Sequence, residues 1–592
     1  MYTNIVAKHT NVGEVLKLAT ELISLGILFL CAILGGIIAA KFKQPAVFGL
    51  LLVGAIIGPN SLNLVQDVGM IRMMAELGAM LLLFIVGLEF DISKLMKIGA
   101  RTLIIGLMKF AIVLFIGYEI TLLLGFSAKV ALFVGVLLSF SSTVVIVKVL
   151  EQKELFRRKE VPLLVAILII EDILAVLALT FFSGVEDPSI GVISTFEKII
   201  FSIGILVFAY YIIMKILGYG VNLILKNSSD ESVLTFLSLA IGALFSYFAF
   251  YLGLTPSAGA FLAGSLIASL PNAKEFGKAV HPYTLIFTSI FFISMGTLVD
   301  FKAIEPNLAL IAALIITAII TRLISIGFLT YLLANFRHDQ PFFASIAMVS
   351  IGEFSLLVAN ESEKFALGVD LVTITAVIIF ITAIVMSIGI NYSEQLHSAL
   401  RPRLHGRIGP RIENISNYMR RFFDQLEIEN HFTKKLRVEA KLSLILIVLA
   451  VFTFFVLRRL SLIIAANYHI FVLYLFYALS TLLILFLLRL IYKELSQVHI
   501  TLSVILTHVD MSRDLKKCRL TLKNLAIALL LFFAAMLFPF AIFALNLSIW
   551  ANIMPFAIGI SSLYYLNNFI LLIEGRNYHL KGNSLGTYAA KY

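Results

Sequence analysis

Long apolar stretches follow one another along almost the whole chain. In the first two-thirds we count thirteen, separated by short polar segments, at about residues 20–40, 44–58, 71–90, 101–124, 128–149, 161–183, 195–225, 231–253, 256–270, 283–299, 307–334, 342–360 and 370–391. A helix of roughly 18–25 apolar residues crosses a hydrocarbon core about 30 Å thick. Because backbone groups in lipid must find hydrogen-bond partners within their own segment, the pattern predicts an all-α, polytopic membrane protein.

The chain after residue 392 has a different pattern. A basic segment, 393–438, is followed by four more apolar stretches near residues 440–457, 463–491, 521–546 and 549–573. We therefore expect a transmembrane domain over 1–392, a basic cytoplasmic linker over 393–438 and an additional transmembrane domain over 439–592. The polar stretch 493–519 is expected to form an amphipathic helix. The last spans are expected to serve either membrane anchoring and dimer packing or a regulatory role.

Composition and charge agree with the hydrophobic pattern. The chain is 60% hydrophobic and 14% charged, whereas soluble domains carry about 25% charged residues. Its net charge of +11 does not indicate nucleic acid binding, because the basic residues lie mainly in alternate short loops between apolar spans. By the positive-inside rule these loops face the cytoplasm, so the N-terminus lies outside and residue 392 onward inside. Cys31 and Cys518 offer neither a disulfide framework nor metal-ligand spacing.

The sixth span carries two adjacent acidic residues near its middle, Glu171 and Asp172. A charged residue at that depth costs about 2.5–3.5 kcal/mol on insertion scales, so each one needs a compensating role. Neighbouring residues on a helix point about 100° apart, so the two carboxylates are not expected to share one partner. We expect one to face a cation path and the other a packed neighbour. A structural ion pair with another helix is the alternative, above all for Glu171.

Three further charged residues lie within predicted spans: Lys109 in the fourth, Arg322 in the eleventh and Glu353 in the twelfth. Arg322 stays protonated and is therefore a fixed counter-charge. Lys109 could release a proton if desolvated, or could snorkel or pair with an acid. Glu353 either belongs to the site or caps a helix terminus. Together with the acidic pair these residues give three acids against two bases, and a bound cation or proton could neutralise the remaining negative charge.

Two apolar spans are interrupted by small polar residues. The interruptions are Ser139, Ser141, Ser142 and Thr143 in the fifth span and Ser350 and Gly352 in the twelfth. Polar breaks at matching places in two halves of a transporter are typical of discontinuous helices around an ion site at the membrane midplane. Hydroxyl and carbonyl oxygens at the breaks would then join Asp172 as ligands. Packing of helices through serine residues is the alternative.

In its first two-thirds the sequence resembles the monovalent cation:proton antiporters, in the branch of the glutathione-gated potassium efflux systems and some bacterial sodium/proton antiporters. The resemblance covers about residues 20–392. It rests on QPAVFGLLLVGAIIGPN (44–60), LLLFIVGLEFD (81–91), SFSSTVVIVKVLE (139–151) with IEDILAV (170–176), GAFLAGSLIA (259–268) with FFISMGTLVDF (291–301), and Gly352-Glu353-Phe354. It implies a 13-helix sodium/proton antiporter-like fold with inverted repeats and two crossing discontinuous helices.

The resemblance also implies roles for the charged residues. Asp172 corresponds to the carboxylate that binds the cation and the proton in the family, and Glu171 to its variable neighbour. Arg322 stands where the family has Lys or Arg, while Lys109 stands where we expect a neutral polar residue. We expect Arg322 to pair with Glu171. The expected site contains Asp172, Glu171, Ser142 and Thr143 as cation and proton ligands, supported by the charges of Arg322, Glu353 and Lys109.

The sequence therefore predicts an antiporter, not an enzyme, that exchanges Na⁺ or K⁺ for H⁺ by an elevator-type movement. We expect a homodimer in a lipid bilayer, in a prokaryotic inner membrane, with no resident cofactor and no nucleic acid partner. A potassium efflux channel-like protein or a non-transporting membrane sensor is the alternative. The nucleotide-binding module usual in this branch is expected to be absent, because no Gly-x-Gly-x-x-Gly unit occurs after residue 392.

Overall fold

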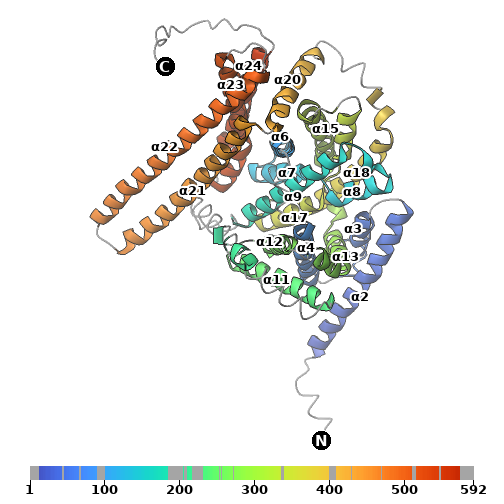
Figure 1. The fold of residues 1–592 in the computed structure, drawn as a ribbon. Coiled ribbons are helices and arrows are strands. Elements are labelled where there is room, and N and C mark those ends of the chain that lie inside the picture. Colours follow the sequence, from blue (N-terminus) through green and yellow to red (C-terminus); the bar gives the residue numbers. More distant parts are fainter. Residues whose placement is uncertain are drawn as a thin grey trace, which may run out of the picture. The chain divides into compact units, whose positions relative to one another are not determined.

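The computed structural model consists of helices and one isolated β-bridge in the part of the chain that it describes (Figure 1). This part comprises residues 12–42, 46–65, 68–89, 100–184, 204–205, 208, 210–215, 231–252, 254, 256–270, 273–334, 336, 339–395, 397–398, 409–428, 430–467, 470–509, 515–545 and 549–573. The chain divides into two compact units. The first consists of Met1–Thr330, Phe336–Ser398 and Pro539–Ile549, and the second of Tyr331–Asn335, Ala399–Phe538 and Trp550–Tyr592.

The first unit contains a group of helices that we call the scaffold bundle. Its members are α2 (Val12–Lys41), α3 (Ala46–Ile57), α4 (Val68–Glu89), α11 (Glu231–Tyr251), α12 (Pro256–Ala268) and α13 (Ala273–Thr297). Helix α4 packs against α12 and α13, and α3 packs against α2 and α13 (Figure 1). Small residues allow this close approach, because a Cβ added to Gly264 of α12 would lie 2.0 Å from the carbonyl oxygen of Phe84 in α4.

Eight other helices, wholly or mainly in the first unit, form what we call the core bundle. They are α6 (Ala100–Leu123), α7 (Ala128–Ser139), α8 (Thr143–Gln152), α9 (Val161–Gly184), α15 (Leu308–Leu333), α16 (Gln340–Ala347), α17 (Glu353–Ser362) and α18 (Leu371–Asn391). Each half repeats one order, in which a long helix is followed by two half-helices and a second long helix. The fifth and twelfth predicted spans are thus each divided in two, which confirms the breaks expected from their polar residues.

The described residues include ten helices long and apolar enough to cross a membrane. Shorter apolar helices such as α3, α7 and α12 account for further stretches of the predicted pattern. The seventh predicted stretch, 195–225, lies mostly outside the described residues. The count of thirteen spans therefore stays a prediction.

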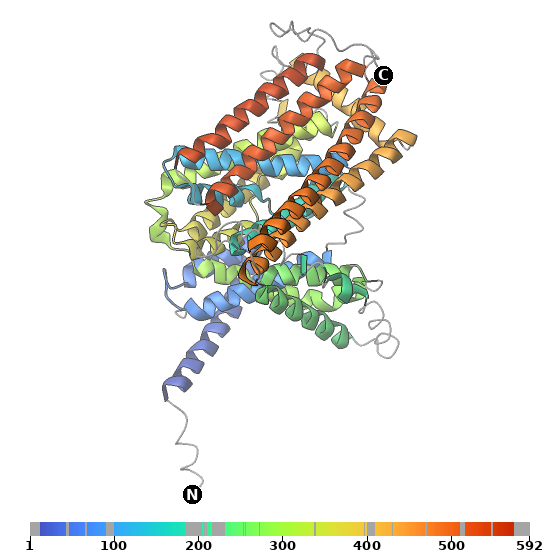
Figure 2. The same ribbon diagram turned by 90° about the vertical axis from the view of Figure 1, so that its left-hand side faces the viewer.

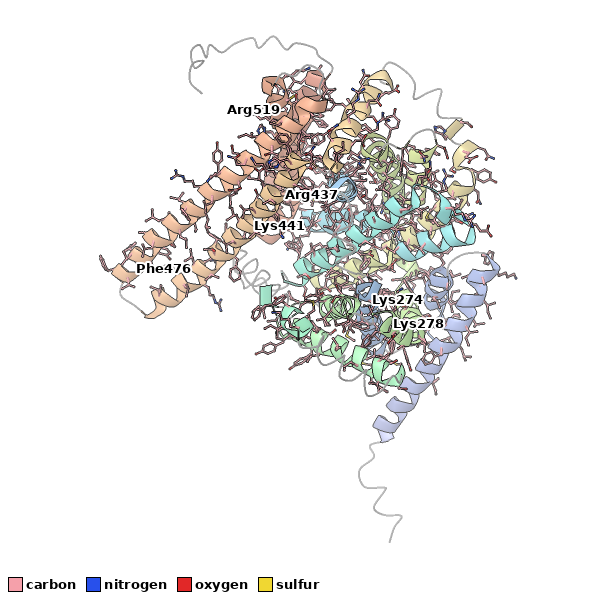
Figure 3. The ribbon with its side chains drawn as sticks, in the orientation of Figure 1. Lys274, Lys278, Arg437, Lys441, Phe476 and Arg519 are labelled. Atoms are coloured by element: carbon pink, nitrogen blue, oxygen red, sulfur yellow. The ribbon has the colours of Figure 1, made fainter. Side chains whose placement is uncertain are left out.

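The second unit is also helical. It holds α20 (Gly409–Glu427), α21 (His431–Asn467), α22 (Ile470–Val509), α24 (Ile553–Ile573) and the larger part of α23 (Leu515–Leu545). Helices α21 and α22 pack side by side as a hairpin (Figure 2). Arg437 and Lys441 lie toward the base of this hairpin and Phe476 lies near its turn (Figure 3).

The boundaries in this unit differ from those expected. Helix α21 continues through Arg458 and Arg459, where the sequence pattern ended a span, and residues 493–509 continue α22 instead of forming a separate helix. Part of the expected linker, 393–438, is helical as well, because it includes α20 and the start of α21. The physical reason is local: residues 433–509 contain neither glycine nor proline, and arginine is a good helix former.

One polar cluster joins the two halves of the core bundle. Arg158, which follows the short 3₁₀ helix η1 (Leu155–Arg157), donates hydrogen bonds to Glu160 Oε1 at 3.1 Å and to Asp339 Oδ2 at 2.6 Å. Its guanidinium also lies 3.9 Å from the ring centre of Phe343. Burial raises the pKa of Asp339, but the hydrogen bond and the charge of Arg158, a backbone hydrogen bond and the charge of His397 together outweigh burial and hold that pKa below its usual value. The cluster ties the start of α9 to the start of α16.

We expect Asp339→Asn to lower the stability of the detergent-solubilised protein by about 0.5–1 kcal/mol, since the pair is partly exposed and screened. Because folding depresses the pKa of Asp339, its contribution is present above about pH 4 and disappears as the pH falls through the folded-state value. Thermal unfolding of both proteins between about pH 7 and 3 measures this. The control is Glu154→Gln, which removes an exposed acid from the loop that contains Arg158. If the difference in stability between the unmodified protein and Asp339→Asn were the same at every pH, the prediction would be contradicted.

Candidate functional site

The two broken helices of the core bundle cross at their unwound segments. Helix α7 ends at Ser139 and α8 begins at Thr143, while α16 ends at Ala347 and α17 begins at Glu353. Between them, Ser141 and Ile351 form an antiparallel β-bridge. The backbone N–H of Ser142 donates to Ser350 O at 3.0 Å, and that of Gly352 donates to Phe140 O at 3.3 Å. Each break leaves backbone N–H and C=O groups without hydrogen bonds inside a helix. At the crossing, some of these groups bond to the other broken helix.

Gly352 is required for this close approach. A Cβ added there would lie 2.6 Å from the carbonyl oxygen of Ser141 and 2.9 Å from the Cα of Ser142, both of them backbone atoms. Any side chain would therefore push the two segments apart. The glycine that marked the break in the sequence also permits the crossing.

Glu171 of α9 is held in a buried ion pair beside the crossing. Its Oε1 accepts a hydrogen bond from Lys109 Nζ of α6 at 2.7 Å, and its Oε2 accepts one from the backbone N–H of Ser141 at 2.8 Å. Lys109 also donates to Ser139 O at 2.7 Å and to Ser141 Oγ at 2.9 Å. Three acceptors match the three protons of the ammonium group. Both side chains are buried, so each charge is compensated by the other.

Arg322 of α15 occupies a different position from the one expected. Its guanidinium donates to the carbonyl oxygens of Leu138 at 2.5 Å, Phe140 at 3.0 Å and Ala318 at 3.3 Å. The expected pair between Arg322 and Glu171 is therefore wrong, because Lys109 holds that carboxylate. The physical cause is the broken end of α7, whose unpaired carbonyls carry the negative end of the helix dipole and attract a cation.

Asp172 of α9 contacts the start of the other half-helix, α8. Its Oδ1 accepts a hydrogen bond from Thr143 Oγ1, the first residue of α8, at 3.4 Å. The carboxylate is largely buried, with 6% of the residue exposed. The two adjacent acids thus have different partners, as their angular separation on the helix predicted.

Ser142 and Glu353 form a second contact across the crossing. Ser142 Oγ donates to Glu353 Oε2 at 3.0 Å and accepts from the backbone N–H of Val145 at 3.2 Å, which caps the start of α8. Glu353 lies in the first turn of α17, where the helix dipole favours a negative charge. Of the two hydroxyl groups expected beside Asp172, that of Thr143 donates to it, while that of Ser142 donates to Glu353.

Two further hydroxyl groups support the crossing and were not singled out in the sequence. Ser355 Oγ donates to Leu137 O at 2.5 Å, and Thr382 Oγ1 of α18 accepts from the backbone N–H of Ile351 at 3.2 Å. Both are small polar residues inside apolar stretches. That signal was present in the sequence, but many such residues bond only to their own helix, as Thr317 does.

We expect Lys109 and Glu171 to be strongly coupled in stability. Replacing either alone, by Lys109→Met or Glu171→Gln, should cost about 3–5 kcal/mol, because a buried charge loses its partner. The double replacement should cost less than the sum of the two by about 0.5–3 kcal/mol. Melting of the purified proteins in detergent measures the cycle. The matched cycle of Arg322→Met with Glu171→Gln should show a smaller coupling, and the opposite ranking would restore the arginine pair.

A known protein family and several known proteins match this chain. Residues 26–392 match the family model for the transmembrane part of sodium/hydrogen exchangers. The probable Na⁺/H⁺ antiporter GerT of Bacillus cereus is 29% identical over 337 residues, which cover 56% of this chain and 88% of the relative. The Na⁺/H⁺-K⁺ antiporter GerN of the same organism is 26% identical over 374 residues, covering 62% of this chain and 95% of the relative.

A third relative has a different name. The iron transporter MagA of Paramagnetospirillum magneticum is 28% identical over 350 residues, covering 59% of this chain and 79% of the relative. The family model ends at residue 392, where the basic segment begins. Sites described above, from Lys109 to Thr382, all lie within the matched region.

Proposed function

The chain belongs to the sodium/hydrogen exchanger family, and from this membership we propose that it exchanges sodium or potassium ions for protons. It is an integral, multi-pass membrane protein of a transporter family. The observation that carries the proposal is the buried carboxylate of Asp172, which lies beside the Thr143 hydroxyl where the broken helices cross. Its neighbour Glu171 already has a cationic partner in Lys109.

Exchange follows from competition for Asp172. A carboxylate in a low-dielectric environment is costly unless a proton or a cation neutralises it. The proton and the cation bind to the same oxygens, so one excludes the other. The empty, charged site is too costly to carry across the membrane. The core bundle therefore crosses only when it is loaded, and each passage in one direction with a cation is matched by a return with a proton.

The charge balance of the site favours a monovalent ion. Glu171, Asp172 and Glu353 oppose Lys109 and Arg322, which leaves one negative charge among these five residues. One proton or one monovalent cation brings the sum to zero, whereas a divalent cation would leave a buried positive charge. The names of two relatives include sodium and one includes potassium, and both ions accept carboxylate and hydroxyl oxygens. We therefore propose sodium or potassium and not ferrous iron as the cargo.

We further propose that the core bundle moves against the scaffold bundle as an elevator. The residues that form the site come from α6, α7, α8, α9, α15 and α17, all of them in the core bundle. A site carried by one bundle can cross the membrane without being taken apart. A homodimer joined through the scaffold bundle would hold that bundle still. We propose a prokaryotic cell membrane as the location, because several relatives are bacterial.

Asp172→Asn is expected to reduce cation-driven proton flux to the level of empty vesicles, because an amide neither binds a proton nor carries charge. The assay uses purified protein in vesicles with an internal pH-sensitive dye and imposed sodium or potassium gradients. Glu119→Gln, a partly buried acid of α6 away from the crossing, is the control and should retain flux. Cation flux without proton movement in the unmodified protein would indicate a channel-like path, and no flux a sensor.

Thr143→Ala is expected to raise the cation concentration for half-maximal exchange by about tenfold. One hydrogen bond to a charged group contributes about 1.5 kcal/mol, which corresponds to a factor of about ten. Thr143→Ser keeps the hydroxyl and should stay close to the unmodified protein. The same vesicle assay measures both variants. Equal effects of alanine and serine would assign the residue to packing and not to the ion.

A further inference from the structure

A cluster of aromatic rings joins the end of α23 to the core bundle. Its members, all within the first compact unit, are Phe133, Phe181, Phe182, Phe365, Phe540 and Phe543. Phe133 of α7 and Phe182 of α9 stack with ring centres 4.0 Å apart. Phe543 lies 5.9 Å from each of these rings and 5.4 Å from Phe365, in the short helix η2 (Glu363–Phe365).

Phe543 is the centre of this cluster and is 95% buried, with 5% of the residue exposed. Phe540, one turn earlier, packs edge-on against Phe181 at 5.0 Å. Edge-to-face rings at these distances attract one another beyond the area that they bury. Phe540 and Phe543 make their ring contacts with α7 and α9 of the core bundle and with η2, which directly follows α17 of that bundle.

The same helices carry the proposed ion site. Phe181 lies on α9 at roughly 14 Å along the helix from Asp172, by the rise of 1.5 Å per residue. Phe133 lies on α7, whose far end at Ser139 contributes to the crossing. A segment that packs on Phe133 and Phe181 is therefore held against α7 and α9, the helices that position Asp172.

The rest of α23 belongs to the second unit. Within that unit Ser562 of α24 donates a hydrogen bond to Ala528 O of α23 at 2.7 Å. The boundary between the two units falls between Phe538 and Pro539. Pro539 lies inside the helix, where it removes one backbone hydrogen bond and clashes with the preceding turn. A helix with proline at such a boundary has a natural point at which to bend.

We propose that Phe540 and Phe543 anchor residues 539–545 to the core bundle, so that this segment travels with the core, and that Pro539 is the hinge that permits this movement. The inference rests on the proposed function for its transport readout. It assigns the C-terminal helices a mechanical link to the ion-carrying helices. The link consists of one continuous helix whose two parts belong to different units.

The test is a cross-link across the anchor that leaves Phe543 in place. In a background with Cys31→Ala and Cys518→Ala, Phe181→Cys and Phe540→Cys are joined by a short bifunctional thiol reagent. We expect equal cross-linking yield at pH 8 with sodium and at pH 8 with choline in place of sodium; the pH is held constant because thiol reactivity itself falls with pH. Exchange in the cross-linked vesicles should stay within about twofold of the untreated protein. Each single-cysteine variant, treated alike, is the control.

Three results would overturn the anchor: no cross-link, a yield that changes with the ionic condition, or exchange that stops on cross-linking and returns on reduction. The hinge is tested by Pro539→Ala in the cross-linked protein, where a restored backbone hydrogen bond should slow exchange several-fold. Unchanged exchange would overturn the hinge. If the parent protein shows no exchange at all, the proposed function fails, while the cross-linking yield, which needs no transport, still decides the anchor.

Discussion

The structure depends on how two helices can be broken inside a membrane. Each break removes backbone hydrogen bonds, and lipid offers no replacement for them. At the end of α7, the carbonyls of Leu138, Ser139 and Phe140 are taken up in turn by Arg322, Lys109 and Arg322 again, with the N–H of Gly352 as a further donor to Phe140. Two buried cations are thus present because the backbone requires donors, and the acidic residues around them follow from that requirement.

This order of causes explains why the site has unequal carboxylates. Once Lys109 caps Ser139, its ammonium lies close enough to form a buried ion pair with Glu171. Arg322 is committed to carbonyl oxygens and makes no ion pair with Glu171. Asp172 accepts a hydrogen bond from the Thr143 hydroxyl instead. The carboxylate of the buried Lys109 pair and the carboxylate that we propose to bind the ion are therefore different side chains.

Much of this could be predicted from sequence, because it depends on local pattern. Apolar runs gave the helices, and the interruptions at Ser141 and Gly352 gave the breaks. The angle between neighbouring residues separated Glu171 from Asp172. The choice between Lys109 and Arg322 could not be predicted, since both are cations on other helices and only the packing of α6 and α15 around α7 decides between them. In the second unit, Arg458 and Arg459 suggested a loop, but arginine inside an uninterrupted helix costs little helix propensity.

The placement of Glu171 and Asp172 next to each other has a mechanical consequence. On one turn of α9, the first carboxylate is fixed to α6 and to the backbone of Ser141, and the second reaches the start of α8. A shift of α9 that moved Asp172 would also have to break the buried pair of Glu171, which is costly. The paired Glu171 therefore keeps Asp172 in place beside the crossing. If Asp172 binds the ion as we propose, the site is held rigid because the paired carboxylate of Glu171 lies on the same helical turn.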